Sequence, residues 1–79
     1  MLKIGLLWLD DNPQRPFGAK IERAAAYYAT KYGQTPNVCY VHPSCLPQPA
    51  PEGTTIAVRV AQDILPHHFL LGVALGGLD

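Results

Sequence analysis

The sequence has few charged residues and few groups suited to catalysis. Its 79 residues include six Lys plus Arg and six Asp plus Glu, so the formal net charge is zero, and Ser44 is the single serine. The basic residues are scattered and form no stripe that would follow a phosphate backbone, which argues against nucleic acid as a partner. The sequence also lacks a Gly-x-Ser-x-Gly nucleophile elbow and a glycine-rich phosphate loop. We therefore expect a protein that is not an enzyme and that needs no cofactor.

Long apolar runs and an export signal are missing as well. The longest apolar run, 69–75, falls short of the 18 or more residues that a membrane helix needs, so we expect no membrane partner. The N-terminal apolar segment has no small-residue cleavage pattern, which predicts a cytoplasmic location. The two cysteines, Cys39 and Cys45, are expected to be free thiols in a reducing compartment, although one disulfide between them stays arithmetically possible.

What the chain does have is apolar surface, since 48% of its residues are hydrophobic. A chain of this size buries apolar area worth on the order of 120 kcal/mol when it folds. Ordering its residues costs a similar amount, at about 1.5 kcal/mol each. This near balance predicts one small domain, 1–79, that gains stability by associating with a partner.

One helix is indicated by the spacing of apolar residues in 19–32. Ile21, Ala24, Ala25, Tyr28 and Tyr32 recur at the period of one helix face, and Gly33 is well placed to end the helix. The same pattern predicts that the charged side chains of this segment face solvent. Those side chains belong to Glu22, Arg23 and Lys31.

Four segments have strand character. The run 3–9 is almost continuously apolar, which predicts a strand covered on both faces, with a buried helix as the alternative. Segment 38–41 is rich in β-branched and aromatic residues, segment 54–60 alternates, and segment 68–75 is expected to form a hairpin with 54–60. Between them, four prolines in 43–53 predict a surface loop with polyproline character.

These elements predict an α/β domain, with α+β as the alternative. Its β-α-β-β order gives two layers, with one helix packed on a three- or four-stranded sheet. One helix cannot cover both faces of such a sheet. We therefore expect a homo-oligomer, most simply a dimer, in which a second copy covers the remaining face.

An acidic pair follows the first predicted strand. The sequence Leu9-Asp10-Asp11-Asn12-Pro13 resembles the start of response-regulator receiver domains, in which an acidic pair helps to hold Mg²⁺ beside a phosphorylatable aspartate. The resemblance covers about 3–33, and the remainder of the chain does not follow the receiver pattern. It implies a Mg²⁺ site at Asp10 and Asp11. The alternative is that both carboxylates solvate the strand end and cap the following loop.

A second metal hypothesis rests on Cys39, His42 and Cys45. Their Cys-x₂-His-x₂-Cys spacing supplies the thiolate and imidazole ligands that Zn²⁺ prefers. The alternative is that the cysteines are ordinary small core residues. Either metal site would make the protein a metal-binding regulatory domain, which is the alternative to a non-enzymatic interaction or adaptor domain.

Five residues are candidates for contact with an unknown protein partner: Trp8, Tyr27, Arg59, His67 and His68. Tyr27 is displaced by about 100° from its neighbour Tyr28 in the apolar stripe, which favours an exposed position; the alternative is that Tyr27, Tyr28 and Tyr32 all lie partly on the sheet. Trp8 requires a hydrogen-bond partner for its indole N–H if it is buried, and an interface can supply one. Arg59 is expected to point outward or into an interface. The two histidines suit pH sensing or anion binding, or else one faces solvent while the other packs as an aromatic ring.

Overall fold

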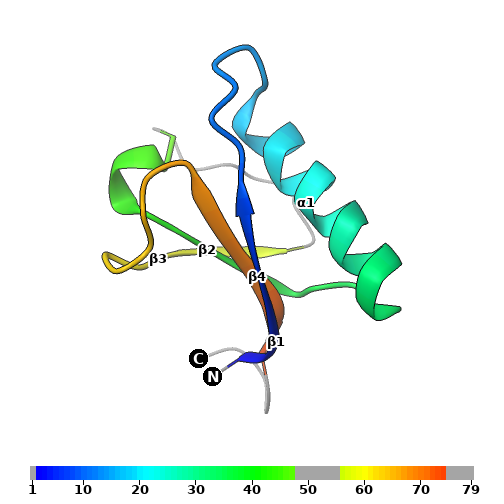
Figure 1. Ribbon diagram of the computed structural model, residues 1–79. Helices are drawn as coiled ribbons and strands as arrows, with labels where there is room; N and C mark the ends of the chain where they lie inside the picture. The colour runs from blue at the N-terminus through cyan, green and yellow to red at the C-terminus, as the bar shows by residue number, and fades with distance from the viewer. Residues whose placement is uncertain (1, 48–55, 75–79) are drawn as a thin grey trace.

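The fold is a mixed four-stranded sheet with one helix across one of its faces (Figure 1). The computed structural model describes residues 2–47 and 56–74. Its elements are, in chain order, β1 (Leu2–Leu9), α1 (Phe17–Tyr32), β2 (Val38–Val41), the 3₁₀ turn η1 (Pro43–Cys45), β3 (Ala57–Val60) and β4 (His68–Ala74). The predicted two-layer α/β architecture is confirmed.

The strands lie in the order β1-β4-β2-β3, which differs from the predicted pairing. β4 pairs antiparallel with both β1 and β2, whereas β3 pairs with β2 in parallel. The predicted hairpin between β3 and β4 is therefore wrong. β3 and β4 do not form a hairpin because β4 lies in the centre of the sheet, between β1 and β2, where its apolar residue Leu71 is fully buried.

β1 lies at an edge of the sheet, and the expected cover on both of its faces is wrong. Leu6 and Trp8 pack against the core on the helix side. Leu7 and Leu9 point to the opposite face, and each is 58% exposed. The apolar run thus supplies one buried row and one exposed row, because successive side chains of a strand alternate between its faces.

α1 begins two residues before the predicted helix and ends at the predicted residue. Pro16 is extended (φ −61°, ψ 154°) and precedes the first helical residue, Phe17, because proline has no N–H to place in a helix interior. At the other end Gly33 adopts a left-handed conformation with φ 74°, and its N–H donates to the carbonyl of Ala29 at 2.9 Å. Glycine takes this conformation without the strain that a side chain would add.

The core lies between α1 and the sheet. The predicted helix stripe is confirmed, because three of its residues are buried and the other two pack against the core at partial exposure. The buried members of the core are Ile21, Ala24, Tyr28, Cys39, Val41, Ile56, Phe69 and Leu71. Glu22, Arg23 and Lys31 are exposed, as expected.

Several predictions fall partly on residues 48–55 and 75–79, which lie outside the described part of the chain. They concern most of the loop 43–53, the first residues of segment 54–60 and the C-terminal stretch. Within the described part, the loop begins as η1 rather than as an extended segment. Val58 packs against the core while Val60, expected on the same face, is 50% exposed at the end of β3. The described residues contain no helix of the length and apolarity that a membrane span requires.

Candidate functional site

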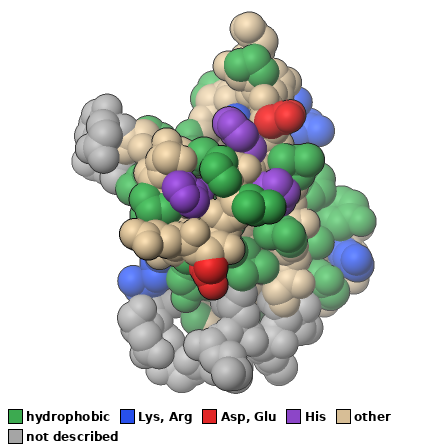
Figure 2. Space-filling model, turned by 60° about the vertical axis from the view of Figure 1, so that its left-hand side comes forward, with side chains coloured by type: hydrophobic (Ala, Val, Ile, Leu, Met, Phe, Trp, Pro, Cys, Tyr) green, Lys and Arg blue, Asp and Glu red, His purple; other side chains and the backbone are tan. Residues whose placement is uncertain are grey.

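Most of the polar candidates gather at one end of the sheet. Asp10 follows β1 and His42 follows β2, while His67 and His68 stand at the start of the antiparallel β4. The Asp10 N–H donates to the carbonyl of His67 at 3.0 Å, which joins two of these segments. Figure 2 shows the three histidines of the chain on one face, with apolar side chains between them. The fold therefore brings together residues that are far apart in the sequence.

Asp10 is an internal ion-pair partner at this end. Its side chain is nearly buried, and the Arg15 guanidinium donates to both of its carboxylate oxygens at 2.9 and 3.0 Å. The Asn12 N–H also donates to Asp10 Oδ1 at 3.2 Å. Burial by itself would raise the pKa of Asp10, but the Asn12 amide and the Arg15 guanidinium outweigh it and lower that pKa.

This geometry matches the loop-capping alternative for the acidic pair. The oxygens of Asp10 that a Mg²⁺ ion would need already accept hydrogen bonds from within the chain, and Asp11 is exposed. A metal ion would have to displace Arg15 from a nearly buried carboxylate. The Asp10–Arg15 pair is therefore a structural link between the end of β1 and the loop before α1.

The residues of the predicted zinc site are divided between the core and the surface. Cys39 is fully buried on the helix side of β2, and this burial raises the pKa of its thiol to about 12. His42 caps η1, because its Nδ1 accepts the Ser44 N–H at 3.0 Å and lies 2.7 Å from Ser44 Oγ. Cys45 Sγ accepts the N–H of His67 at 3.3 Å. Both cysteines are free.

Across residues 2–47 and 56–74, no three His, Cys, Asp or Glu side chains lie where they could hold a metal ion together. Cys45 lies instead at a cavity of about 230 Å³ at the end of the sheet. The cavity is lined by Phe17, Lys20, Ser44, Cys45, His67 and Phe69. Lys20 was not predicted to lie here, because its position in the first turn of α1 becomes informative only when that turn is placed beside η1.

His67 and His68 have different surroundings. His67 is exposed and has a left-handed backbone with φ 67°, which is uncommon for a residue other than glycine. His68 is half-buried, and its Nδ1 lies 3.0 Å from the carbonyl oxygen of Pro66. The pair thus has one exposed and one half-buried histidine, which is the arrangement expected if neither residue senses pH or binds an anion.

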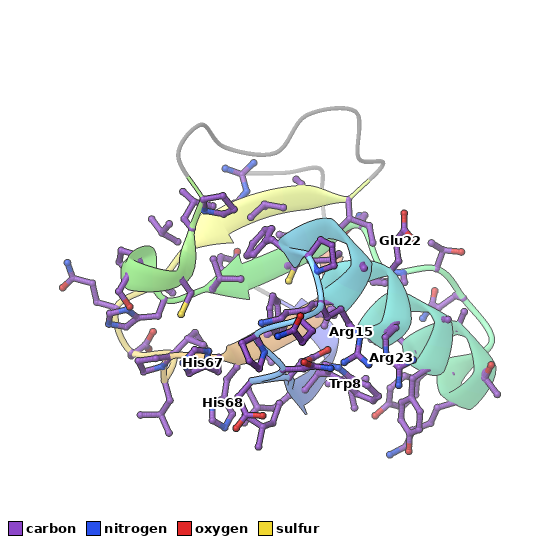
Figure 3. The ribbon with its side chains drawn as sticks, turned by 90° about the horizontal axis from the view of Figure 1, so that it is seen from above. Trp8, Arg15, Glu22, Arg23, His67 and His68 are labelled. Carbon is purple, nitrogen blue, oxygen red and sulfur yellow. The ribbon has the colours of Figure 1, made fainter. Side chains whose placement is uncertain are left out.

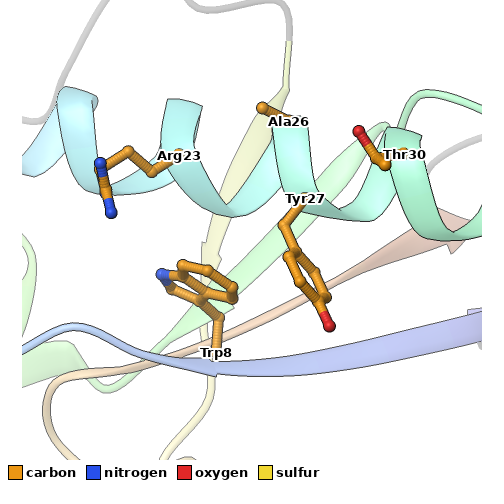
Figure 4. A pocket seen from close by; sticks show the side chains of 5 residues that line it. All are labelled: Trp8, Arg23, Ala26, Tyr27 and Thr30. Atoms are coloured by element: carbon orange, nitrogen blue, oxygen red, sulfur yellow. The ribbon is translucent and has the colours of Figure 1, made fainter.

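A second candidate site lies between α1 and the edge strand β1. The rings of Trp8 and Tyr27 meet there with centroids 5.1 Å apart and planes at 46°. Both residues line a groove of about 370 Å³ with Arg23, Ala26 and Thr30 (Figure 4). Trp8 and Tyr27, which the sequence suggested as separate contact residues, thus touch one another. Arg23 lies beside them in the groove, but its exposed helical position did not mark it as a candidate in the sequence.

The indole of Trp8 has an unusual environment. Its Nε1 atom is buried and has no hydrogen-bond partner among the described residues. Figure 4 shows this nitrogen directed toward the Arg23 side, and Trp8 and Arg23 also lie near one another in the view of Figure 3. Tyr27 is 47% exposed. Trp, Tyr and Arg are the side chains most enriched in the energetic centres of protein interfaces, so the groove suits contact with a protein.

The face of the sheet opposite α1 carries a row of large side chains. Leu7 pairs with Leu70, Leu70 with Tyr40, and Tyr40 with Arg59 across the four strands. Residues paired across a sheet share a face, so this row runs from one edge to the other. Arg59 is half-buried within it, and Leu9 extends the row along β1.

No family model matches the sequence, and neither a curated protein nor a solved structure is similar to it. Two neighbouring surfaces near the C-terminal end of β1 are the structural features that bear on function: the strand-end cluster around Asp10, and the apolar face and groove around Leu7 and Trp8.

Proposed function

We propose that this protein is a small, non-enzymatic interaction module that associates with itself in the cytoplasm. The observation that carries the proposal is the exposure of Leu7 and Leu9, at 58% each, on the face of β1 opposite α1. Burying a leucine side chain fully is worth about 1.5–3 kcal/mol. Contiguous apolar surface of this kind is typical of protein contact sites.

The contacts of the polar residues support a role without catalysis. Asp10 is held by Arg15, His42 caps η1, and Cys39 is buried in the core with a raised pKa. Each group thereby stabilises the fold locally. A general base or nucleophile would instead need to be poised toward a substrate. The two free cysteines support the proposed cytoplasmic location, where thiols are kept reduced.

A second copy of the chain suits this surface better than a strongly charged partner. The row on the open face includes Leu7, Tyr40 and Leu70, and Arg59 is its charged member. An apolar patch is complementary to itself, as a twofold interface requires. Because the formal net charge is zero, two copies do not repel one another at long range.

Sedimentation equilibrium from low to high micromolar concentration tests this proposal. We expect a concentration-dependent dimer of the full chain and a folded monomer for Leu7→Asp, since the substitution replaces an apolar contact by two like charges, one from each copy. Leu65→Asp is the matched control, because Leu65 is also exposed, at 65%, but lies in the connection between β3 and β4. A monomeric wild-type chain would refute the proposal, as would equal dissociation by both variants with native circular dichroism.

A further inference from the structure

We propose that two copies join their β1 strands edge to edge and antiparallel, around a twofold axis at Leu7. The two four-stranded sheets would then form one continuous sheet. This inference rests on the self-association proposed above and adds the strand edge, that of β1, and the register through which the two copies pair.

The backbone groups of β1 point alternately toward β4 and toward the outer edge. The Asp10 N–H donates to His67, on the side of β4. Successive residues of a strand direct their N–H and C=O groups to opposite sides. The β1–β4 register shifts between Leu2 and Gly5. Beyond this shift the even-numbered residues Leu6 and Trp8 therefore bond β4, and the odd-numbered residues face the outer edge.

An independent contact on β4 agrees with this alternation. The carbonyl of Gly72 accepts the Asn37 N–H, so Gly72 directs its backbone toward β2 rather than β1. Gly72 stands opposite Gly5 in the β1–β4 register. Gly5 therefore makes no ladder hydrogen bond to β4, and its polar groups point to the edge together with those of Leu7 and Leu9.

A twofold axis restricts the register in which two β1 strands can pair. With Leu7 opposite the partner's Leu7, Gly5 stands opposite the partner's Leu9. All three outward-facing residues are then used, and because each such pair exchanges two hydrogen bonds, three pairs supply about six. Any other twofold register that uses these odd-numbered residues leaves at least one of them outside the pairing.

The side chains fit the same register. Gly5, Leu7 and Leu9 share the face opposite α1, since Leu6 and Trp8 occupy the helix side. Leu7 would pack on the partner's Leu7. Leu9 would lie over the partner's Gly5, which has no side chain to obstruct it. The two leucines that are 58% exposed in the monomer would then contact apolar neighbours across the twofold axis.

The edge itself is open to strand addition. β1 is the longest strand of the sheet at eight residues and contains no proline, and Lys3 is its one charged residue. Proteins commonly protect exposed edges with prolines, several charges or very short strands.

Proline substitutions test the arrangement with a matched pair. Leu7→Pro removes an N–H that points to the β1 edge, and we expect it to abolish the dimer while the fold persists, since edge strands tolerate proline. Val60→Pro is the control at the opposite edge. The N–H groups of Ala57 and Ala61 donate to the carbonyls of Asn37 and Val41, on the side of β2. Because successive residues alternate, the N–H of Val60 points away from β2, to the outer edge. We expect Val60→Pro to leave the dimer intact.

Amide hydrogen exchange by NMR supplies a second readout on the wild-type chain. We expect protection of the Gly5, Leu7 and Leu9 amides to rise with protein concentration, while Leu6 and Trp8 stay protected throughout. In a mixture of isotope-labelled and unlabelled chains, we expect an interchain nuclear Overhauser effect between the Leu6 Hα atom of one copy and the Trp8 Hα atom of the other. A dimer in sedimentation without these changes would overturn the strand arrangement alone. Absence of any dimer would overturn the proposed function with it.

Discussion

Nη1 of Arg15 lies 2.9 and 3.0 Å from the two carboxylate oxygens of Asp10, so one guanidinium nitrogen holds both oxygens of a side chain in a residue that is 6% exposed. The pair links the end of β1 to the loop that leads into α1. Burial acts to raise the pKa of Asp10, and the Asn12 amide and Arg15 overcome it, so the pKa of the folded state lies below the ordinary value of 3.8.

Arg15→Met is expected to destabilise the protein by about 1–3 kcal/mol at neutral pH, because it leaves a nearly buried carboxylate without its ionic partner. Since folding lowers the pKa of Asp10, its contribution to stability is present above pH 3.8 and is lost as the pH falls through the lower, folded-state value. Urea unfolding at a series of pH values measures this. The difference between wild type and Arg15→Met should shrink in acid, whereas exposed Arg23→Met should differ little at any pH. A pH-independent loss would contradict the assignment.

The two thiols should react at very different rates. Cys39 is fully buried and the pKa of its thiol is raised to about 12, while Cys45 is half-buried at the edge of a cavity. Because the thiolate is the reactive form, we expect one rapid equivalent of reaction with a chromogenic disulfide in the native protein and two after denaturation. Cys45→Ser should abolish the rapid equivalent. Rapid reaction of both thiols in the native state would show that Cys39 is not protected as described.

Alkaline pH provides a separate test of Cys39. Burial raises its pKa from 9.0 to about 12, so the folded state retains a proton that the unfolded state loses. The contribution to stability is complete below about pH 9 and declines between the two pKa values. Cys39→Val should flatten this decline in urea titrations. The pKa of Tyr28 is also raised by burial, so part of the alkaline loss should remain in the variant.

The helix was predictable from the sequence because its information is local. The spacing of Ile21, Ala24 and Tyr28 identifies one face over three turns, and Gly33 marks the end through a conformation that glycine favours. The start of the helix was harder to predict, because it depends on Pro16 standing directly before the first helical residue, Phe17.

The strand order could not be derived in the same way. The runs that became β1 and β4 are almost equally apolar, so hydrophobicity alone does not decide which one is central. Pairing β4 with both β1 and β2 depends on contacts across most of the chain, for example Leu7 with Leu70. Similarly, Trp8 and Tyr27 could be singled out individually, but their contact depends on where α1 crosses β1. Asp10 and Arg15 are only five residues apart, and the proline-containing turn between them was the available signal.

Trp8 is the single tryptophan, so its fluorescence reports on the groove beside β1. Tyr27→Ala removes the ring that lies 5.1 Å from the indole, and we expect a loss of about 0.5–1.5 kcal/mol together with red-shifted emission as water reaches the indole. Thr30→Ala, in the same groove, is the control and should change neither quantity appreciably. Emission and unfolding are measured on the same samples. Unchanged emission in Tyr27→Ala would mean that the tyrosine ring does not shield Trp8.

Two glycines of the helical segment should respond to alanine with opposite signs. Gly33 has φ 74°, where a side chain costs about 1–2 kcal/mol, so Gly33→Ala should lower the free energy of unfolding by that amount. Gly18 is the second residue of α1, where alanine is favoured over glycine by up to about 0.5–1 kcal/mol, so Gly18→Ala should raise the free energy of unfolding. A Cβ atom at either position meets no other atom within 4 Å, so the backbone conformation alone determines each sign. Urea unfolding of the two variants at one protein concentration measures both, and a neutral Gly33→Ala would contradict the left-handed end of α1.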